Sequence, residues 1–208
     1  MRMDLPDADV VLRPQWLPAQ DAQALLRTLL DEVPWEIHRI RIFGREVDSP
    51  RLSCWMGDPQ ARYRYSGTRF EPHPWLPALL PLRERLQAET GRTFNSVLLN
   101  RYRDGRDGMG WHSDDEPELG PAPVIASLSL GATRRFVLRD RRQPSRKAEF
   151  ALAHGDLLLM AGQTQRHCQH ALPKTARAVG ERINLTFRWI APVSAGGGQG
   201  VAGTRPSR

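Results

Sequence analysis

From residue 91 onward the chain consists of short strand-like segments separated by turns, and this pattern limits the possible folds more than any other feature. We expect seven or eight such segments, rich in leucine, β-branched and aromatic residues, the clearest being 94–102, 124–130, 135–138, 148–153, 156–160, 167–171 and 182–190. Consecutive strands without intervening helices form a sandwich, a jelly roll or a barrel. The sequence therefore predicts a β-dominated domain.

The part of the chain before residue 91 has a different pattern, which predicts two helices. Residues 18–32 carry alanine and leucine at helical spacing behind Asp21, an acidic residue suited to a first turn. A second helix is expected over 76–90 and should end at Gly91. With the strands that follow, these helices indicate an α+β fold dominated by strands.

Between the two helices we expect a hairpin. Residues 35–42 and 51–56 are both extended in pattern, and Phe43-Gly44 between them is typical of a turn. The 208 residues suit one compact domain. We therefore divide the chain into three parts. Residues 1–93 form N-terminal helices and a hairpin packed on the core, residues 94–191 form a β-domain, and residues 192–208 form a tail predicted to be disordered.

The charge balance favours a polyanionic partner. The chain has 30 basic and 23 acidic side chains and a formal net charge of +7, which suits nucleic acid. Only Lys147 and Lys174 are lysines, so the excess is arginine, which a GC-rich genome would also produce through codon bias.

Cysteine content and hydropathy indicate the compartment. Two cysteines and the absence of an export signal suit a reducing, cytoplasmic setting. No apolar run approaches the roughly 20 residues of a membrane helix, so we expect no membrane contact. No protein partner is predicted, and we expect a monomer.

His112 and Asp114 lie two residues apart in a glycine-rich segment and are candidate metal ligands. Two imidazoles and one carboxylate fill one face of an octahedral iron(II) ion and leave the opposite face open for chemistry. The second histidine would come from a strand far downstream, where His167 and His170 compete. Residues three apart on a strand face opposite sides, so only one of the two would point inward.

The last expected strand carries polar residues at even spacing, which places them on one face of the sheet. Buried guanidiniums need an anion, and a dicarboxylate would bind them through paired hydrogen bonds. The alternative is that the arginines pair with internal acids or face solvent. The strand residues are Arg182, Asn184, Thr186 and Arg188, and Asn100 and Tyr102 could add neutral donors.

Four segments resemble the AlkB family of iron(II)- and 2-oxoglutarate-dependent nucleic-acid demethylases, in particular its animal DNA- and RNA-repair homologues. They are LLNRYRDGRDGMGWHSDDEPELG, IASLSLGATRRFVLR, LAHGDLLLMAGQTQRHCQHALPK and RINLTFRWI, and RIFGREVDSPRLSCWMGD upstream is similar more weakly. The resemblance implies a double-stranded β-helix, or jelly roll, supported by the two N-terminal helices, with the hairpin as a nucleotide-recognition element.

The resemblance also implies the site. Iron(II) would be held by His112, Asp114 and His170, which favours His170 over His167. The cosubstrate 2-oxoglutarate would be held by Asn100, Tyr102, Arg182, Asn184, Thr186 and Arg188.

The activity implied is oxidative demethylation of N-alkylated bases such as 1-methyladenine and 3-methylcytosine in DNA, with RNA as a further possible substrate. The reaction would consume O2 and 2-oxoglutarate and release formaldehyde, succinate and carbon dioxide. One alternative is a dioxygenase of the same kind acting on a protein or a small molecule. A second is a non-enzymatic jelly-roll binding module.

Four residues are expected to contact the substrate by likeness to the family. Asp115 and Glu116 follow the metal aspartate, and a carboxylate there would favour a cationic alkylated base; the alternative is an acidic, solvated turn. Phe43 at the hairpin tip resembles a wedge that fills the gap left by a flipped base, or it caps the hairpin as a buried residue. Arg51 would contact phosphate.

One position departs from the family pattern. The relatives usually carry an aromatic residue that stacks on the extruded base, in the slot matched here by Met56. Methionine packs on a base more weakly through its sulfur, and Trp55 should point to the other side of the strand. Either Trp55 has taken over the contact through a register shift, or the pocket is more permissive.

Overall fold

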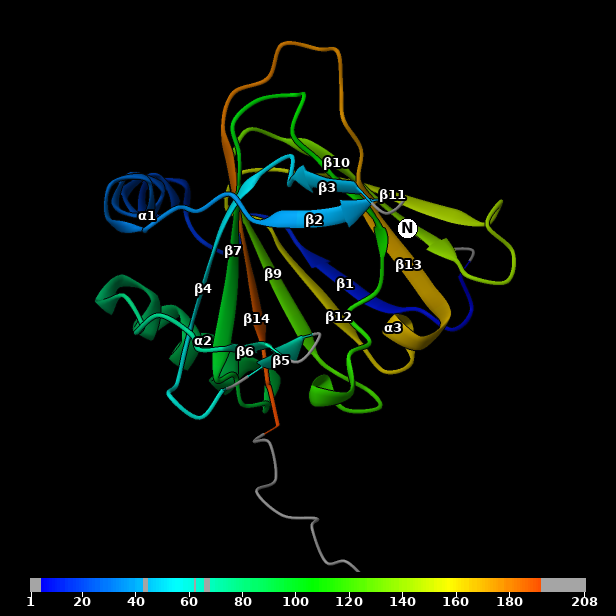
Figure 1. Cartoon of the computed structure of the whole chain (residues 1–208), viewed down its shortest axis with the longest axis horizontal. Helices are drawn as coiled ribbons and strands as arrows, with labels where there is room; N and C mark the ends of the chain where they lie inside the picture. The colour runs from blue at the N-terminus through cyan, green and yellow to red at the C-terminus, as the bar shows by residue number, and fades with distance from the viewer. Residues whose placement is uncertain (1–4, 43–44, 62, 66–67, 192–208) are drawn as a thin grey trace, which may run out of the picture.

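The computed structural model describes residues 5–42, 45–61, 63–65 and 68–191. Its framework is two antiparallel sheets (Figure 1). The larger has the order β1-β12-β9-β14-β7-β4, with strands Asp9–Arg13, Leu157–Ala161, Ile125–Gly131, Arg182–Arg188, Ser96–Tyr102 and Leu52–Gly57. The smaller has the order β11-β10-β13-β8, with strands Lys147–Leu152, Arg134–Asp140, Cys168–Leu172 and Met109–His112.

The two sheets face each other and form a jelly roll. One apolar cluster joins side chains of both sheets, namely Tyr102, Ile125, Leu158 and Met160 with Phe136, Leu152 and Leu172. The fold predicted from the sequence is therefore confirmed, including its strand-dominated α+β character.

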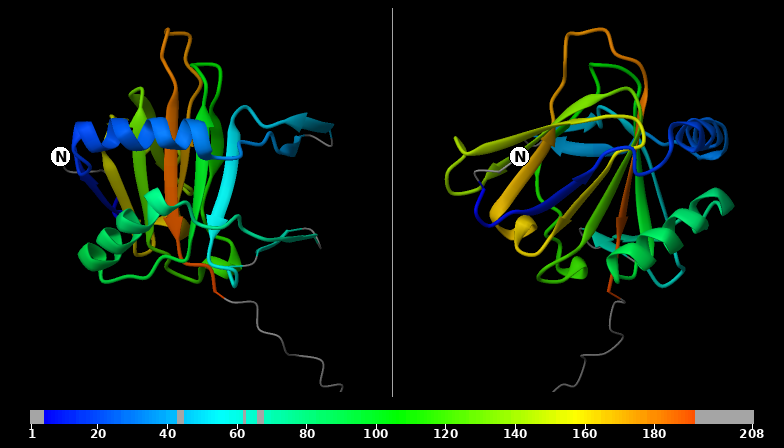
Figure 2. Two further views of the ribbon diagram at one scale, coloured as in Figure 1. Left: turned by 90° about the vertical axis from the view of Figure 1, so that its left-hand side faces the viewer. Right: turned by 180° about the vertical axis from the view of Figure 1, so that it is seen from behind.

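Two helices cover the outer face of the larger sheet. These are α1 (Ala19–Glu32) and α2 (Leu80–Thr90), the latter preceded by the 3-10 turn η1 (Pro77–Leu79). Figure 2 shows both helices in front of the strands of this sheet. Their leucines pack with apolar side chains from β4, β7, β9 and β14. Gly91 ends α2 in the left-handed conformation, with φ 64°, as predicted from the sequence.

Two small hairpins project beyond the edge strand β4 (Figure 2). One pairs β2 (Arg39–Ile42) with β3 (Arg45–Asp48), and the other pairs β5 (Tyr63–Tyr65) with β6 (Thr68–Phe70). The expected hairpin therefore exists, but its second strand is Arg45–Asp48, and the two strands predicted for it meet at the antiparallel bridge between Glu36 and Ser53. Residues 52–57 instead form β4 and pair with β7, because Cys54 and Met56 belong to the main core.

Three further details differ from expectation. Strand β1 pairs with β12 and had no predicted counterpart. The glycine-rich segment before His112 contains the short strand β8. The short helix α3 (Thr164–His167) interrupts the run of strands, so His167 is helical.

The proposed division of the chain stays a prediction. Strands β1 and β4 come from residues 1–93, yet both belong to the larger sheet. The tail of residues 192–208 lies outside the described residues. Among the described residues, no helix is long and apolar enough to cross a membrane.

Candidate metal and cosubstrate site

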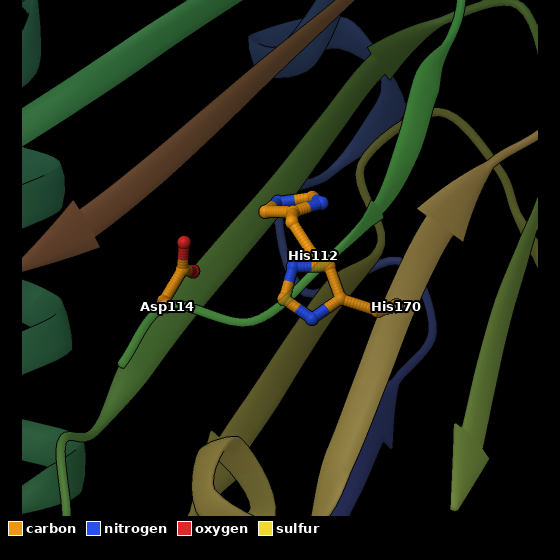
Figure 3. A group of neighbouring side chains, drawn as sticks. All are labelled: His112, Asp114 and His170. Atoms are coloured by element: carbon orange, nitrogen blue, oxygen red, sulfur yellow. The ribbon is translucent and has the colours of Figure 1, made fainter. Parts of the chain in front are cut away.

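The side chains of His112, Asp114 and His170 converge beside β8, the edge strand of the smaller sheet (Figure 3). His112 ends β8, and His170 lies directly opposite it on β13 in the strand register. One ligand atom from each of the three residues lies within 4.8 Å of the other two. This is the ligand set, and the compactness, of a site for one metal ion.

The glycines of this region let the loop approach β13 closely. A Cβ atom on Gly108 would lie 2.7 Å from the backbone oxygen of Leu172. Any other residue would push the loop away and shift β8, which follows immediately. The glycine-rich pattern therefore positions His112.

The protonation states favour metal binding. Burial and the neighbouring His112 lower the pKa of His170 to about 3, so its imidazole is neutral at physiological pH. Burial alone would raise the pKa of Asp114, which is 3% exposed, but Arg188 and the two imidazoles outweigh burial and lower it. A neutral imidazole and an ionised carboxylate are the forms that bind metals.

Hydrogen bonding around the triad also fits an ion. Nδ1 of His112 lies 2.9 Å from the backbone oxygen of Gly110, as it does when Nε2 is left to bind a metal. Among the described residues, Nδ1 of His170 is buried without a hydrogen-bond partner. The side-chain chemistry therefore fits the metal that the sequence implies.

A polar pocket adjoins the triad on the inner face of the larger sheet. It is lined by the three candidate ligands together with Asn100, Tyr102, Arg182, Asn184, Thr186 and Arg188. The structure thus brings together all nine residues expected to hold metal and cosubstrate. The alternation along β14 explains why: its even-numbered residues face the pocket, while Ile183, Leu185 and Phe187 pack toward the helices.

The two arginines of the pocket differ in their partners. Nη2 of Arg188 lies 3.5 Å from Oδ1 of Asp114, so this arginine pairs with an internal acid. Arg182 is 1% exposed, and within the described part of the chain it forms no ion pair. Its Nη2 donates instead to Ser129 and Asn184, at 2.9 and 2.7 Å.

A buried guanidinium without a carboxylate partner is energetically costly. Burial lowers the pKa of Arg182 to about 10. Nε of Arg182 and Nε of Arg188 are both buried without partners among the described residues. The pocket therefore offers hydrogen-bond donors suited to an anion at the Arg182 end and ligand atoms suited to a cation at the triad.

Comparison with known proteins identifies the family. Residues 9–188 match the family model of the 2OG-Fe(II) oxygenase superfamily. The chain belongs to this superfamily. The rat alpha-ketoglutarate-dependent dioxygenase alkB homolog 3 is 43% identical over 195 residues, which cover 88% of this chain and 64% of the relative. The mouse DNA oxidative demethylase ALKBH2 is 41% identical over 182 residues, covering 83% of this chain and 76% of the relative.

These identities place the chain in the AlkB family within the superfamily. The chain spans 64% to 66% of the length of the alkB homolog 3 relatives from rat and human. Among solved structures, OsALKBH1 matches with a TM-score of 0.62 at 19% identity, covering 90% of this chain and 99% of that one. A Burkholderia pseudomallei oxygenase of the superfamily matches with a TM-score of 0.59 at 18% identity, covering 88% and 87%. These two likenesses support the fold.

In this AlkB-family chain, His167 lies apart from the triad. It ends α3 and lines a separate depression with Asp140, Arg141, Arg142 and Arg166. The argument that both histidines share a strand was therefore wrong, although His170 is the one that meets His112 and Asp114.

The two acids after Asp114 have different surroundings. Asp115 is partly exposed and pairs with Arg141 at 2.8 Å. Glu116 has one buried carboxyl oxygen, Oε2, without a partner among the described residues. Burial and the nearby Asp114 raise its pKa, whereas Arg188 lowers it, and the net direction is upward. Of the two, Glu116 has the unused acceptor.

The remaining candidates for contact with the base differ in where their side chains lie. Met56 is 1% exposed in the core against the helices, so it cannot contact a base, and that prediction was wrong. Trp55 faces the other way: it lies opposite Leu98, which lies opposite Thr186 of the pocket. The pairing of β4 is regular, so no register shift is needed for Trp55 to face inward. Phe43 lies outside the described residues.

The side chain of Arg51 enters the wall of the pocket. Its Nε donates to Oδ1 of Asn100 at 2.8 Å, inside the wall of the pocket. Its predicted contact with phosphate stays a prediction, since this hydrogen bond uses only Nε of the guanidinium.

Sequence reasoning missed several residues around the pocket. Ser127 lines the pocket and Phe136 stacks on His170, with ring centroids 5.4 Å apart. The serine was detectable, since Ser127 and Ser129 alternate with apolar residues along β9. Arg134 was not detectable: it is buried and donates to backbone oxygens of Asp104, Asp107 and Pro173, which ties together the loops beside β8 and β13.

Proposed function

We propose that this chain removes N-alkyl groups from DNA bases such as 1-methyladenine and 3-methylcytosine, using iron(II), 2-oxoglutarate and O2. The products are formaldehyde, succinate, carbon dioxide and the repaired base. One observation carries the proposal: a compact two-histidine, one-carboxylate triad shares a pocket with a buried arginine that forms no ion pair in the described residues. The 41% identity to mouse DNA oxidative demethylase ALKBH2 supports the choice of substrate.

In this proposal His112, Asp114 and His170 hold the iron. When bound, the metal with 2-oxoglutarate and O2 supplies the oxidation of an alkyl carbon. The residues of the chain orient the reactants and keep the ligands in their binding forms, with Arg188 pairing with Asp114 and thereby keeping it ionised.

The cosubstrate is proposed to lie along β14, with one carboxylate at Arg182. A carboxylate there would pair with the guanidinium and offset the cost of its burial. Tyr102 lies beside Arg182, and burial raises the pKa of its phenol above the ordinary value despite three nearby arginines. The phenol therefore keeps its proton and donates to a carboxylate. Further polar contacts would come from Asn100, Asn184 and Thr186.

Recognition of the alkylated base is proposed to involve Glu116. A 1-methyladenine or 3-methylcytosine base carries a positive charge and an exocyclic amino donor. The unpartnered Oε2 of Glu116 would accept that donor, and the cationic base would compensate the buried carboxylate. Asp115, already paired with Arg141, would contribute charge at the rim.

The target base must leave the stack to reach the pocket. Trp55 faces inward from β4 and is proposed as the aromatic surface beside the extruded base. The role of Phe43 as a wedge stays a prediction, since the turn between β2 and β3 is outside the described residues.

We further propose that the protein acts as a monomer in the cytoplasm. Cys54 and Cys168 are both free and buried, which is consistent with a reducing compartment.

The test is formaldehyde release from an oligonucleotide carrying 1-methyladenine or 3-methylcytosine, with iron(II), 2-oxoglutarate and ascorbate. We expect release with the natural chain and none with His112→Ala. A matched RNA oligonucleotide decides whether RNA is also a substrate. Succinate without formaldehyde would move the substrate to a protein or a small molecule, and neither product would favour a binding module.

A further inference from the structure

The position of Arg51 points to a role at the cosubstrate pocket. Arg51 directly precedes β4, and its partly buried side chain reaches Asn100 on β7. Ser53 is the cross-strand neighbour of Asn100, and Arg51 lies two residues before Ser53, on the same face of the strand. The guanidinium therefore enters the wall of the pocket from its edge.

The hydrogen bond fixes the orientation of the Asn100 amide. A side-chain amide offers an oxygen that accepts and a nitrogen that donates, and the two can exchange places by rotation. In this structure Nε of Arg51 donates to the oxygen at 2.8 Å. The amide nitrogen, Nδ2, donates no hydrogen bond within the described residues. It is therefore the donor that the pocket presents to an anion.

In the described part of the chain, the guanidinium of Arg51 also has no acid close enough to form an ion pair. Burial lowers the pKa of this guanidinium. Asp107 raises the pKa of Arg51 through its negative charge, but both carboxylate oxygens of Asp107 already accept hydrogen bonds from Arg103, at 2.8 and 2.9 Å. Three positive charges lie close enough to Tyr102 to lower the pKa of its phenol, namely those of Arg182, Arg51 and Arg134. This end of the pocket thus carries positive charge suited to a carboxylate.

We propose that Arg51 is a positioning residue for the cosubstrate: it holds the Asn100 amide so that Nδ2 donates to a carboxylate, and it adds to the positive field of Arg182. The inference rests on the proposed function for the identity of the ligand. It replaces the phosphate contact that the sequence suggested for this arginine.

The test is the affinity for 2-oxoglutarate, measured by calorimetry on the full chain with manganese(II) in place of iron(II), so that no turnover occurs. We expect Arg51→Met to raise the Kd about tenfold, the size of one hydrogen bond to a charged group. Binding of a 1-methyladenine oligonucleotide, measured across salt concentrations, should keep its affinity and its salt dependence.

Arg101→Met is the matched control. Arg101 follows Asn100 on β7, points to the other side, and pairs with Glu181 at 2.6 Å. Its loss should leave 2-oxoglutarate binding unchanged, because its side chain pairs with Glu181 and does not line the pocket.

Action through Asn100 is tested by a double-mutant cycle. In an Asn100→Ala background, Arg51→Met should raise the Kd for 2-oxoglutarate by less than about threefold, because the amide that Arg51 holds is already gone. Arg51→Lys keeps the charge but lacks the Nε–H geometry, and should give an intermediate Kd. If Arg51→Met fails to fold, Arg51→Lys carries the same comparison.

Two results would overturn the inference. Unchanged 2-oxoglutarate affinity, with weaker oligonucleotide binding and a salt slope reduced by about one, would make Arg51 a phosphate contact. Equal effects of Arg51→Met with and without Asn100 would show that it acts independently of the amide. Failure of the natural chain itself to bind 2-oxoglutarate would instead refute the proposed function, and the inference with it.

Discussion

One face of β14 packs against the helices and the other lines the pocket, and the two faces have opposite chemistry. On the helix side Phe187 stacks with Trp75, with ring centroids 6.2 Å apart, and meets Phe94 edge-on at 6.4 Å. On the pocket side Arg182 is equally buried but has only neutral partners in the described residues. Both side chains are hidden from water, yet only the first is stabilised by what surrounds it.

The difference shows that burial alone does not separate structural residues from functional ones. Burial of an apolar side chain stabilises the folded state, whereas burial of an unpaired cation destabilises it. We therefore expect substitutions on the helix face to reduce stability, and substitutions on the pocket face to reduce ligand binding at little cost in stability.

Phe187→Ala should have the largest effect. Removing a fully buried ring that contacts two other aromatic residues leaves a cavity, and we expect the free energy of unfolding to fall by about 3–5 kcal/mol. Chemical denaturation measures it. The folded fraction should bind 2-oxoglutarate with unchanged affinity, and a selective loss of that affinity would break the distinction between the faces.

Arg182→Met should show the opposite pattern. We expect the Kd for 2-oxoglutarate to rise about 100-fold, because a buried charged partner of a carboxylate is lost. The unfolding free energy without ligand should change by less than about 1 kcal/mol, since relief of desolvation offsets the lost hydrogen bonds to Ser129 and Asn184. Calorimetry and denaturation of the same sample test both claims, and strong destabilisation of the ligand-free protein would contradict them.

The alternation of β14 is a part of the structure that the sequence could predict. A strand reading Arg-Ile-Asn-Leu-Thr-Phe-Arg has two unlike faces, and the structure places them as the period of two requires. The main strands after residue 91 were also identifiable, because each is long enough to show its pattern.

Partners across the fold were not predictable in the same way. Nothing local to Arg51 indicates that it reaches Asn100, because that contact depends on the pairing of β4 with β7. The same pairing determines which of Trp55 and Met56 faces inward. Strand pairing is a property of the whole sheet, so the resemblance to a family could suggest the slot but not which of the two side chains the pairing of β4 turns inward.

Trp55→Ala tests the proposed contact between Trp55 and the extruded base. If Trp55 flanks the extruded base, its loss should weaken binding of a 1-methyladenine oligonucleotide by about tenfold, in line with the value of base–aromatic stacking. The affinity for 2-oxoglutarate should not change, because Trp55 does not line the polar pocket. Trp55→Phe should retain most of the binding. Equal binding by the alanine variant would remove Trp55 from the proposed substrate site.

Met56→Leu is the matched change on the opposite face and should have the smallest effect. Met56 is buried among apolar side chains, and leucine conserves its volume, so we expect the free energy of unfolding to change by less than about 1.5 kcal/mol. Oligonucleotide binding and lesion preference should stay as in the natural chain, because the side chain packs toward the helices and away from the pocket. Competition binding between 1-methyladenine and 3-methylcytosine oligonucleotides is the sensitive measurement. A shift in preference with Met56→Leu, but not with Trp55→Phe, would mean that the side of β4 facing the helices also influences the substrate.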